Sequence, residues 1–381
     1  MNAGIYIHIP FCIRKCPYCD FYSSADLSLV SAFADALIDE IRMAASGGDY
    51  AGAAFDSIYI GGGTPTVMDT RSIARIMAAV SNAFVMLPGV EITIEANPAT
   101  LSARQLTDLR GIGFNRINIG LQSFDDANLD FLGRLHNGHD AVSAVYMAEK
   151  SGFENIGIDL MYGLPEQAPE NWQKDLETAV SLSPAHISCY MLTFEPGTAM
   201  DNARKSGRFK IPGDEAQSNL FRMADQVLTR KGYDHYEISN FARDTHLRSR
   251  HNTGYWNNRP YLGLGPAAHS YAPPVRKANV RSVRRYIGRM EAGKSPVEST
   301  ETLDLQQQIM EAIYLGLRQA DGICSADFNT RFQADFFAIF SDVIGRFVKE
   351  GYLAADSRGC RPTLSGMLMQ ESLAAAFIAA L

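Results

Sequence analysis

Three cysteines near the start of the chain, Cys12, Cys16 and Cys19, have the residue type and the spacing needed to hold iron. They form a Cys-x3-Cys-x2-Cys run directly after a short apolar stretch. A structural zinc site or an ordinary ferredoxin cluster needs four protein ligands, whereas three thiolates on a four-iron, four-sulfur cluster leave one iron open. The run therefore predicts a [4Fe-4S] cluster whose open iron takes a ligand that is not protein.

Other interpretations of the run stay open from the residues alone. It could be a zinc site completed by His8 or Asp20, or a group of reactive thiols. A disulfide framework is not expected, because Cys189, Cys324 and Cys360 are widely scattered and no secretory signal opens the sequence. These two observations together predict a cytoplasmic protein.

Charge and hydropathy exclude two classes of partner. The formal net charge is −7, from 42 acidic and 35 basic residues, which argues against a broad nucleic-acid surface. No apolar run approaches the twenty or so residues that a membrane-spanning helix needs, and the apolar tail 373–381 is typical of a terminal core helix. We therefore expect no nucleic-acid partner and no membrane span.

The elements that must position the cysteines follow a repeated strand and helix rhythm. Apolar, β-rich runs predict strands at 5–9, 57–60, 91–95, 116–120, 157–160 and 186–192. Between them, apolar residues spaced by three and four predict helices at 28–45, 71–84, 141–151 and 172–181. Six units are too few for an ordinary eight-fold barrel, so the pattern predicts an α/β fold, a partial (β/α)6 barrel, with its site at the carboxyl ends of the strands.

The rest of the chain changes character, which suggests a barrel over 1–200, a connecting region over 201–300 and a C-terminal unit over 301–381. The connecting region has a charged helix at 214–231 and a stretch rich in Gly, Pro and Tyr at 251–274. The last unit predicts helices at 306–317, 326–332 and 336–350 and a short hairpin through 361–364, a winged-helix-like α+β domain. Its third helix mixes acidic and basic residues, so DNA contact is not expected.

Most strand ends of the first half carry glycines or polar side chains. A Gly-Gly-Gly-Thr-Pro segment at 61–65 follows the second strand, where missing side chains would let backbone approach a ligand. Glu95 ends the third strand and could accept hydrogen bonds from ribose hydroxyls. Gln122 and Asp159 end the fourth and fifth, and Arg134 follows nearby. Singly, these are also ordinary turns and solvated strand ends, so their order along the chain is the informative feature.

Taken together, these motifs resemble the radical S-adenosylmethionine (SAM) enzymes, and more narrowly the oxygen-independent coproporphyrinogen III oxidase group. The resemblance rests on Tyr-Ile-His-Ile-Pro-Phe-Cys at 6–12, the cysteine run, the segment 61–65, Glu-Ala-Asn-Pro at 95–98, Leu-Gln-Ser at 121–123 and the stretch 159–165. It implies that Cys12, Cys16 and Cys19 hold the cluster, whose open iron SAM chelates and whose electron releases a 5′-deoxyadenosyl radical. The residues implied to contact SAM are Tyr6, Tyr18, Gly62, Gly63, Thr64, Glu95, Gln122, Arg134 and Asp159.

Two departures separate this chain from the oxidases. The oxidase pattern has a further cysteine where this chain has Phe21, and it has an extension ahead of its cluster, whereas here four residues precede Ile5. Both features are similar to the HemW-type haem chaperones, which implies binding of haem, its delivery to acceptor proteins and an external electron donor. Two other functions stay open: porphyrinogen decarboxylation to protoporphyrinogen IX, and a binding module in which cluster and SAM are structural.

The segment His-Asn-x-x-Tyr-Trp at 251–256 is also similar to the HemW branch. His251 is a candidate axial ligand of haem iron, because imidazole is the commonest such ligand. An equally plausible role for His251 is a hydrogen-bonded histidine in a loop that packs Tyr255 and Trp256 into the core. His269 is a second, weaker candidate ligand.

Overall fold

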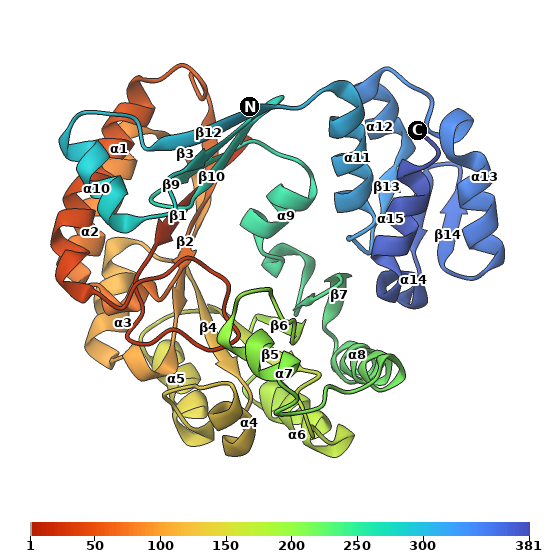
Figure 1. Ribbon diagram of the computed structural model, residues 1–381, viewed down its shortest axis with the longest axis horizontal. Coiled ribbons are helices and arrows are strands. Elements are labelled where there is room, and N and C mark those ends of the chain that lie inside the picture. The colour runs from red at the N-terminus through yellow and green to blue at the C-terminus, as the bar shows by residue number, and fades with distance from the viewer. Residues whose placement is uncertain (1) are drawn as a thin grey trace.

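The computed structural model describes residues 2–381 and has six parallel strands at the centre of one curved sheet (Figure 1). All six predicted strands are confirmed, most of them somewhat longer than expected. They lie side by side in chain order, each parallel to the next. Their bounds are β1 (Asn2–Ile9), β2 (Ala54–Gly62), β3 (Val85–Ala96), β4 (Arg116–Gln122), β5 (Asn155–Tyr162) and β6 (His186–Met191).

Polarity alternates along these six strands. Alternate isoleucines, such as Ile5 and Ile7 in β1 and Ile117 and Ile119 in β4, pack into the main hydrophobic core. The residues between them point to the opposite face, which we call the inner face. Its polar members are Tyr6, His8, Ser57, Tyr59, Glu91, Thr93, Glu95, Arg116, Asn118, Asp159, His186 and Ser188. Parallel strands are usually apolar on both faces, so a polar inner face indicates a binding site rather than a second core.

Helices cover the outer face of the six strands, as the pattern of apolar residues predicts. Their apolar sides are buried in the main core, and side-chain caps fix several starts: Asp69 accepts a hydrogen bond from Ser72 N, and Asn137 and Asp140 form a capping box. The short helices α3 and α4 were not predicted. The bounds are α1 (Val30–Ser46), α2 (Thr70–Ala83), α3 (Ala103–Ile112), α4 (Asp126–Phe131), α5 (Gly138–Lys150) and α6 (Pro169–Ser181).

Residues 201–300 extend the same sheet at both edges. Strands β8 (Asn240–Ala242) and β7 (Asp234–Glu237) add antiparallel beside β6. On the other side β9 (Tyr261–Leu264) pairs parallel with β1, and β10 (His269–Ala272), β11 (Val275–Asn279) and β12 (Val297–Thr302) continue antiparallel. The sheet has twelve strands in the described chain and ends at β12 and β7, so it is open rather than a closed barrel. The helices are α7 (Ala199–Lys205), α8 (Asp214–Arg230), α9 (Arg250–Trp256) and α10 (Val283–Glu291).

Helix α9 has an unusual position among these. It contacts β1 and β2 and also helix α11 (Leu305–Gly316) of the C-terminal unit. Figure 1 shows it between the strands and the C-terminal helices. The segment that carries the His-Asn-x-x-Tyr-Trp motif therefore lies where the two parts of the chain meet.

The C-terminal unit has its own hydrophobic core and a three-stranded sheet. The three predicted helices are confirmed, but the hairpin lies earlier than predicted, because Thr363 caps a helix that begins at Leu364. The apolar tail forms α15, which buries Leu373 and Phe377. Among residues 2–381 no helix is long and apolar enough to cross a membrane. The remaining bounds are β13 (Ile323–Cys324), α12 (Ser325–Phe332), α13 (Phe336–Lys349), β14 (Leu353–Asp356), β15 (Gly359–Pro362), α14 (Leu364–Leu368) and α15 (Gln370–Ile378).

Candidate functional site

The sequence-predicted residues meet at the carboxyl ends of β1 to β5. The cysteine loop follows β1, the glycine segment ends β2, and Glu95, Gln122 and Asp159 lie at or near the ends of β3, β4 and β5. Because the strands are parallel and adjacent, their carboxyl ends share one edge of the sheet. We define this edge, with the cysteine loop above it, as the candidate site.

The cysteine loop is closed at its base and its thiols are partly buried. Ser24 N donates to Pro10 O at 2.7 Å and Cys12 N donates to Ser24 O at 3.1 Å, so the two ends of the loop are tied together. Thr64 Oγ1 donates to Cys12 Sγ at 3.5 Å, and Arg134 Nη1 donates to Cys16 Sγ at 3.6 Å. Two residues implied to contact SAM therefore also contact the predicted cluster ligands.

The arrangement of donors disfavours the zinc interpretation. Among residues 2–381 no three His, Cys, Asp or Glu side chains gather closely enough for a single metal ion. Both ring nitrogens of His8 already have partners, Tyr6 Oη at 3.0 Å and the Tyr22 carbonyl at 2.8 Å. Three thiols on one loop supply the three ligands of an iron–sulfur cube with one open iron, one fewer than a structural zinc ion needs.

The glycines at 61–63 are required by the protein itself. A Cβ on Gly62 would lie 2.5 Å from the His8 ring, and one on Gly63 would lie 2.5 Å from the Phe11 carbonyl oxygen. Gly63 N donates to Ile9 O at 2.8 Å and Thr64 N donates to Phe11 O at 2.7 Å. Close packing of this segment against the base of the cysteine loop is thus a second physical reason for these glycines, beside the expected close approach of a ligand.

Glu95 is held as a hydrogen-bond acceptor by two groups. Tyr59 Oη donates to its Oε1 at 2.7 Å and Gly62 N donates to its Oε2 at 3.0 Å. Burial raises the pKa of Glu95 to about 7, an effect that the Tyr59 hydrogen bond opposes and the nearby Asp159 carboxylate reinforces. A carboxylate fixed in this way presents its remaining lone pairs to the site.

Arg134 and Asp159 keep polar atoms without a protein partner. Arg134 Nη2 donates to Gly120 O at 2.6 Å, but its Nε is buried and unpartnered. Asn118 Nδ2 donates to Asp159 Oδ2 at 2.7 Å, while Asp159 Oδ1 is buried and unpartnered. Since buried polar atoms are normally satisfied, these two fit a polar ligand such as SAM.

Three further predicted residues adjoin this group. Gln122 has a left-handed backbone, φ 73°, and its amide lies beside Gly120, where a Cβ would come within 2.8 Å. Tyr18 packs against a small apolar cluster that includes Leu132 and Met200. Tyr6 lies on the inner face of β1, two residues before His8, and its hydroxyl is hydrogen-bonded to His8 Nδ1 at 3.0 Å.

The two candidate haem ligands differ in surroundings. His251 is buried, 3% exposed, and both ring nitrogens are engaged: Nδ1 with Ser57 Oγ at 3.1 Å and Nε2 with Tyr255 Oη at 2.9 Å. Burial lowers its pKa to about 3, so the ring is neutral. His269 is exposed on β10. In this conformation an iron could reach the His251 ring only if these contacts opened.

Two inner-face residues that the sequence motifs did not single out, Tyr59 and Asn118, adjoin the candidate site, and so does His8, which was considered above as a possible zinc ligand. Tyr59 orients Glu95, Asn118 orients Asp159, and His8 packs against Gly62. On its own strand, each of the three lies two residues from another residue of the inner face. The alternation of isoleucine with polar residues was the available signal.

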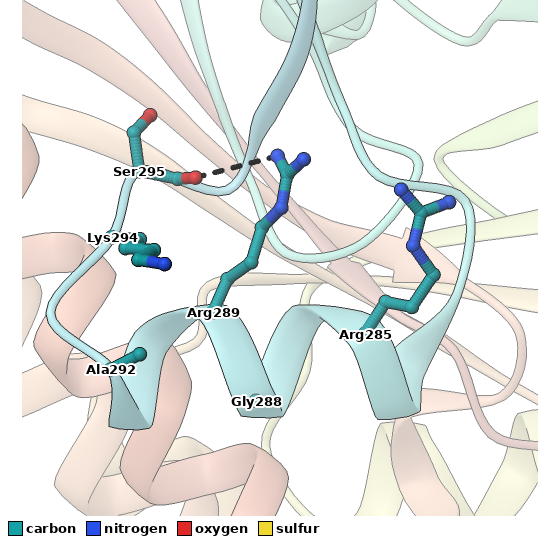
Figure 2. A pocket seen from close by; sticks show the side chains of 6 residues that line it. All are labelled: Arg285, Gly288, Arg289, Ala292, Lys294 and Ser295. Atoms are coloured by element: carbon teal, nitrogen blue, oxygen red, sulfur yellow. Dashed lines mark hydrogen bonds between the residues drawn. The ribbon is translucent and has the colours of Figure 1, made fainter.

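A surface hollow lies elsewhere, beside α10 (Figure 2). Both arginines that line it are already engaged: Arg285 pairs with Glu298 at 2.7 Å, and Arg289 donates to the Val297 carbonyl at 2.8 Å. It contains none of the residues singled out above, so the strand ends remain the candidate site.

Comparison with known proteins gives two family matches and a set of similar chains. The radical SAM superfamily matches residues 6–179 and the HemN C-terminal domain matches residues 303–369. The heme chaperone HemW of Bacillus subtilis is 33% identical over 98% of both chains, and that of Haemophilus influenzae is 39% identical over 70% of this chain and 69% of its own.

Among solved structures, coproporphyrinogen III oxidase (HemN) from Escherichia coli superposes with a TM-score of 0.85, covering 100% of this chain and 90% of its own. Its identity is 23%, so it shows the shared fold. The chain belongs to the radical SAM superfamily and, within it, to the HemW family.

Proposed function

We propose that this protein is a haem chaperone that holds a [4Fe-4S] cluster, SAM and haem, and delivers haem to acceptor proteins. The observation that carries the proposal is the likeness, over nearly the whole chain, to relatives named heme chaperones. Phe21 at the position of the extra oxidase cysteine supports the same choice. Six free thiols fit a cytoplasmic location.

In this proposal Cys12, Cys16 and Cys19 would hold the cluster, which would supply the electron for the chemistry of SAM. The protein's part is to bind and orient. Glu95 accepts from the ribose hydroxyls, and Arg134 donates to the carboxylate of SAM through its unpartnered Nε. Asp159 Oδ1 accepts from a polar group of the ligand.

We place haem at the mouth of the candidate site, the surface formed by the cysteine loop and the end of β6. Exposed apolar side chains there suit a flat apolar macrocycle. Ile13 and Phe21, on the cysteine loop, are 51% and 67% exposed, and Met191, at the end of β6, is 41% exposed. Arg14 and Lys15, on the same loop, are exposed and could pair with haem propionates.

The cluster is tested by anaerobic reconstitution with iron and sulfide. Wild type should bind about four irons and absorb broadly near ~410 nm, and alanine at any of the three cysteines should abolish this. Cys189→Ala is the matched control, because that thiol is buried elsewhere in the sheet. Stable binding of a single zinc ion in place of iron would refute the cluster.

The haem site is tested by titration with hemin. Phe21→Ser should weaken hemin affinity by roughly tenfold, through loss of apolar contact. Val85→Ser is the control, because Val85 is equally exposed (67%) but lies at the amino end of β3. Equal loss in both variants would contradict a haem site at the mouth.

Conversion of coproporphyrinogen III to protoporphyrinogen IX with SAM and dithionite would favour the oxidase function instead.

A further inference from the structure

Helix α9 is fixed against the inner face of the sheet at its first turn. The backbone N–H groups of Arg250 and His251 donate to the two oxygens of Glu91, at 3.1 and 3.2 Å. A Cβ on Gly4 would lie 3.0 Å from His251 Nδ1, so β1 carries glycine where the ring approaches. The His251 side chain therefore has a defined place on the inner face.

The His251 ring lies against the tyrosine that orients Glu95. The rings of His251 and Tyr59 are stacked, with centroids 5.2 Å apart and an angle of 26° between their planes. Tyr6 lies against both rings at 6.3 Å. Ser57 and Tyr255 each form a hydrogen bond with one nitrogen of the His251 ring, so the ring plane cannot turn freely.

We propose that His251 is a positioning residue for SAM binding: held by Ser57 and Tyr255, it fixes the Tyr59 ring, whose hydroxyl holds Glu95 in place to accept from the ribose of SAM. The motif of α9 thus acts from beneath the SAM site rather than as a haem ligand. The inference rests on the SAM-binding part of the proposed function and is independent of haem binding.

The protonation state of the ring agrees with this role. Burial, reinforced by Arg259 and Arg116, lowers the pKa of His251 to about 3. The ring is neutral at physiological pH, so it acts through contact and hydrogen bonds and not through charge.

The test measures SAM affinity of the reconstituted protein by equilibrium dialysis. His251→Asn should weaken SAM binding by about tenfold, and His251→Phe, which keeps a flat ring on Tyr59, should restore most of it. Tyr59→Phe should weaken binding to a similar extent. In the Tyr59→Phe background His251→Asn should add little, because both changes break the same path to Glu95.

His186→Asn is the matched control for burial and folding. His186 is also buried on the inner face, and its Nε2 is paired with Tyr236 Oη at 2.8 Å, as His251 is paired with Tyr255. We expect this variant to lower the melting temperature as His251→Asn does and to leave SAM affinity within about twofold. Hemin titration of His251→Asn should give an unchanged Soret band.

Two outcomes would overturn the inference. One is SAM affinity in His251→Asn that matches the His186→Asn control. The other is a fully additive loss in the Tyr59→Phe, His251→Asn double variant. If wild type bound no hemin at all, the proposed chaperone function would fail while these SAM measurements would still decide the role of His251.

Discussion

At the scale of single residues, the position of Glu95 predicts that the proposed SAM binding depends on pH. Its pKa is raised to about 7 by burial, so the carboxyl is largely protonated below that pH and ionised above it. An ionised oxygen is the stronger acceptor for ribose hydroxyls, so SAM affinity should rise by roughly fivefold between pH 6 and pH 8. Equilibrium dialysis across that range checks this.

Glu95→Gln provides the control for that profile. The amino group of SAM itself titrates in this range, with a pKa near ~8, and contributes equally in both proteins. Around Glu95, the titratable or charged neighbours Tyr59, Tyr6, Asp159 and Arg116 remain unchanged. A glutamine variant with the same pH profile as wild type would show that Glu95 does not bind the ribose.

Thr64 should tune the reduction potential of the cluster. Its hydroxyl donates to Cys12 Sγ, and a hydrogen bond to a ligand sulfur stabilises the more negative, reduced cluster. Thr64→Val should therefore lower the potential by roughly 20–60 mV, the equivalent of one hydrogen bond. A redox titration followed by electron paramagnetic resonance measures this shift.

Thr66→Val is the matched control. Thr66 stands two residues away, is buried, and bonds Thr100 Oγ1 at 2.6 Å and no cysteine. Equal potentials in wild type and both variants would show that the Thr64 hydroxyl does not reach the cluster.

Most of the predicted site residues could be found from the sequence because they stand at or just after the end of an apolar strand, whereas Tyr6, Tyr18 and Arg134 came from the family resemblance. Their partners were harder to identify. Tyr59 and Asn118 lie inside strands, and their roles depend on which residue of the next strand stands opposite, Thr93 and Gly157. Register is set only when strands pair, so the sequence alone does not reveal that the Tyr59 hydroxyl reaches Glu95.

At the scale of elements, the six strands and most helices were predictable because their periods are strong and local. The edges of the sheet were not. Residues 201–300 join it through very short strands, β8 with three residues and β9 with four, on opposite sides of the six. Segments this short carry little periodic signal, and tertiary pairing decides where they go.

Glu40 ties these edge elements to the first helix, and its burial predicts a pH dependence of stability. Its oxygens accept from Gly265 N at 2.7 Å, Asn279 Nδ2 at 2.6 Å and Tyr286 Oη at 2.5 Å. Burial raises its pKa to about 7. Because the unfolded chain loses this proton at lower pH than the fold does, the contribution of Glu40 to stability is greatest below about pH 4.5 and is lost as pH rises to about 7.

Glu40→Gln removes that titration. Between pH 4.5 and 7, the wild type should lose roughly 1–3 kcal/mol of unfolding free energy relative to this variant. Urea unfolding at several pH values measures the shift. Asp39→Asn, an exposed neighbour paired with Arg42, is the control and should show no such trend. A constant difference for Glu40→Gln would contradict the raised pKa.

At the scale of the whole molecule, a buried ion pair joins the sheet to the C-terminal unit. Arg318, just after α11, pairs with Glu237 of β7 at 2.7 Å, and its guanidinium lies over the Trp256 ring of α9 at 4.4 Å. Backbone bonds flank the pair: Ile238 N donates to Arg318 O, and Ala320 N donates to Tyr236 O. The same helix that carries His251 therefore also contacts the C-terminal unit.

Arg318→Met should destabilise this junction strongly, because Glu237 is 0% exposed and would be left without its cation. Losing one partner of a buried pair costs about 3–5 kcal/mol, and protonation of Glu237 would reduce that cost. Urea unfolding measures the loss, with Arg358→Met as control. The Arg358 pair with Asp356 is exposed and should contribute less than about 1 kcal/mol.

Adding Glu237→Gln to Arg318→Met should recover part of the stability, because it removes the unpaired charge. If the two single arginine variants were equally stable, the junction would depend on its backbone bonds and apolar contacts and not on this ion pair.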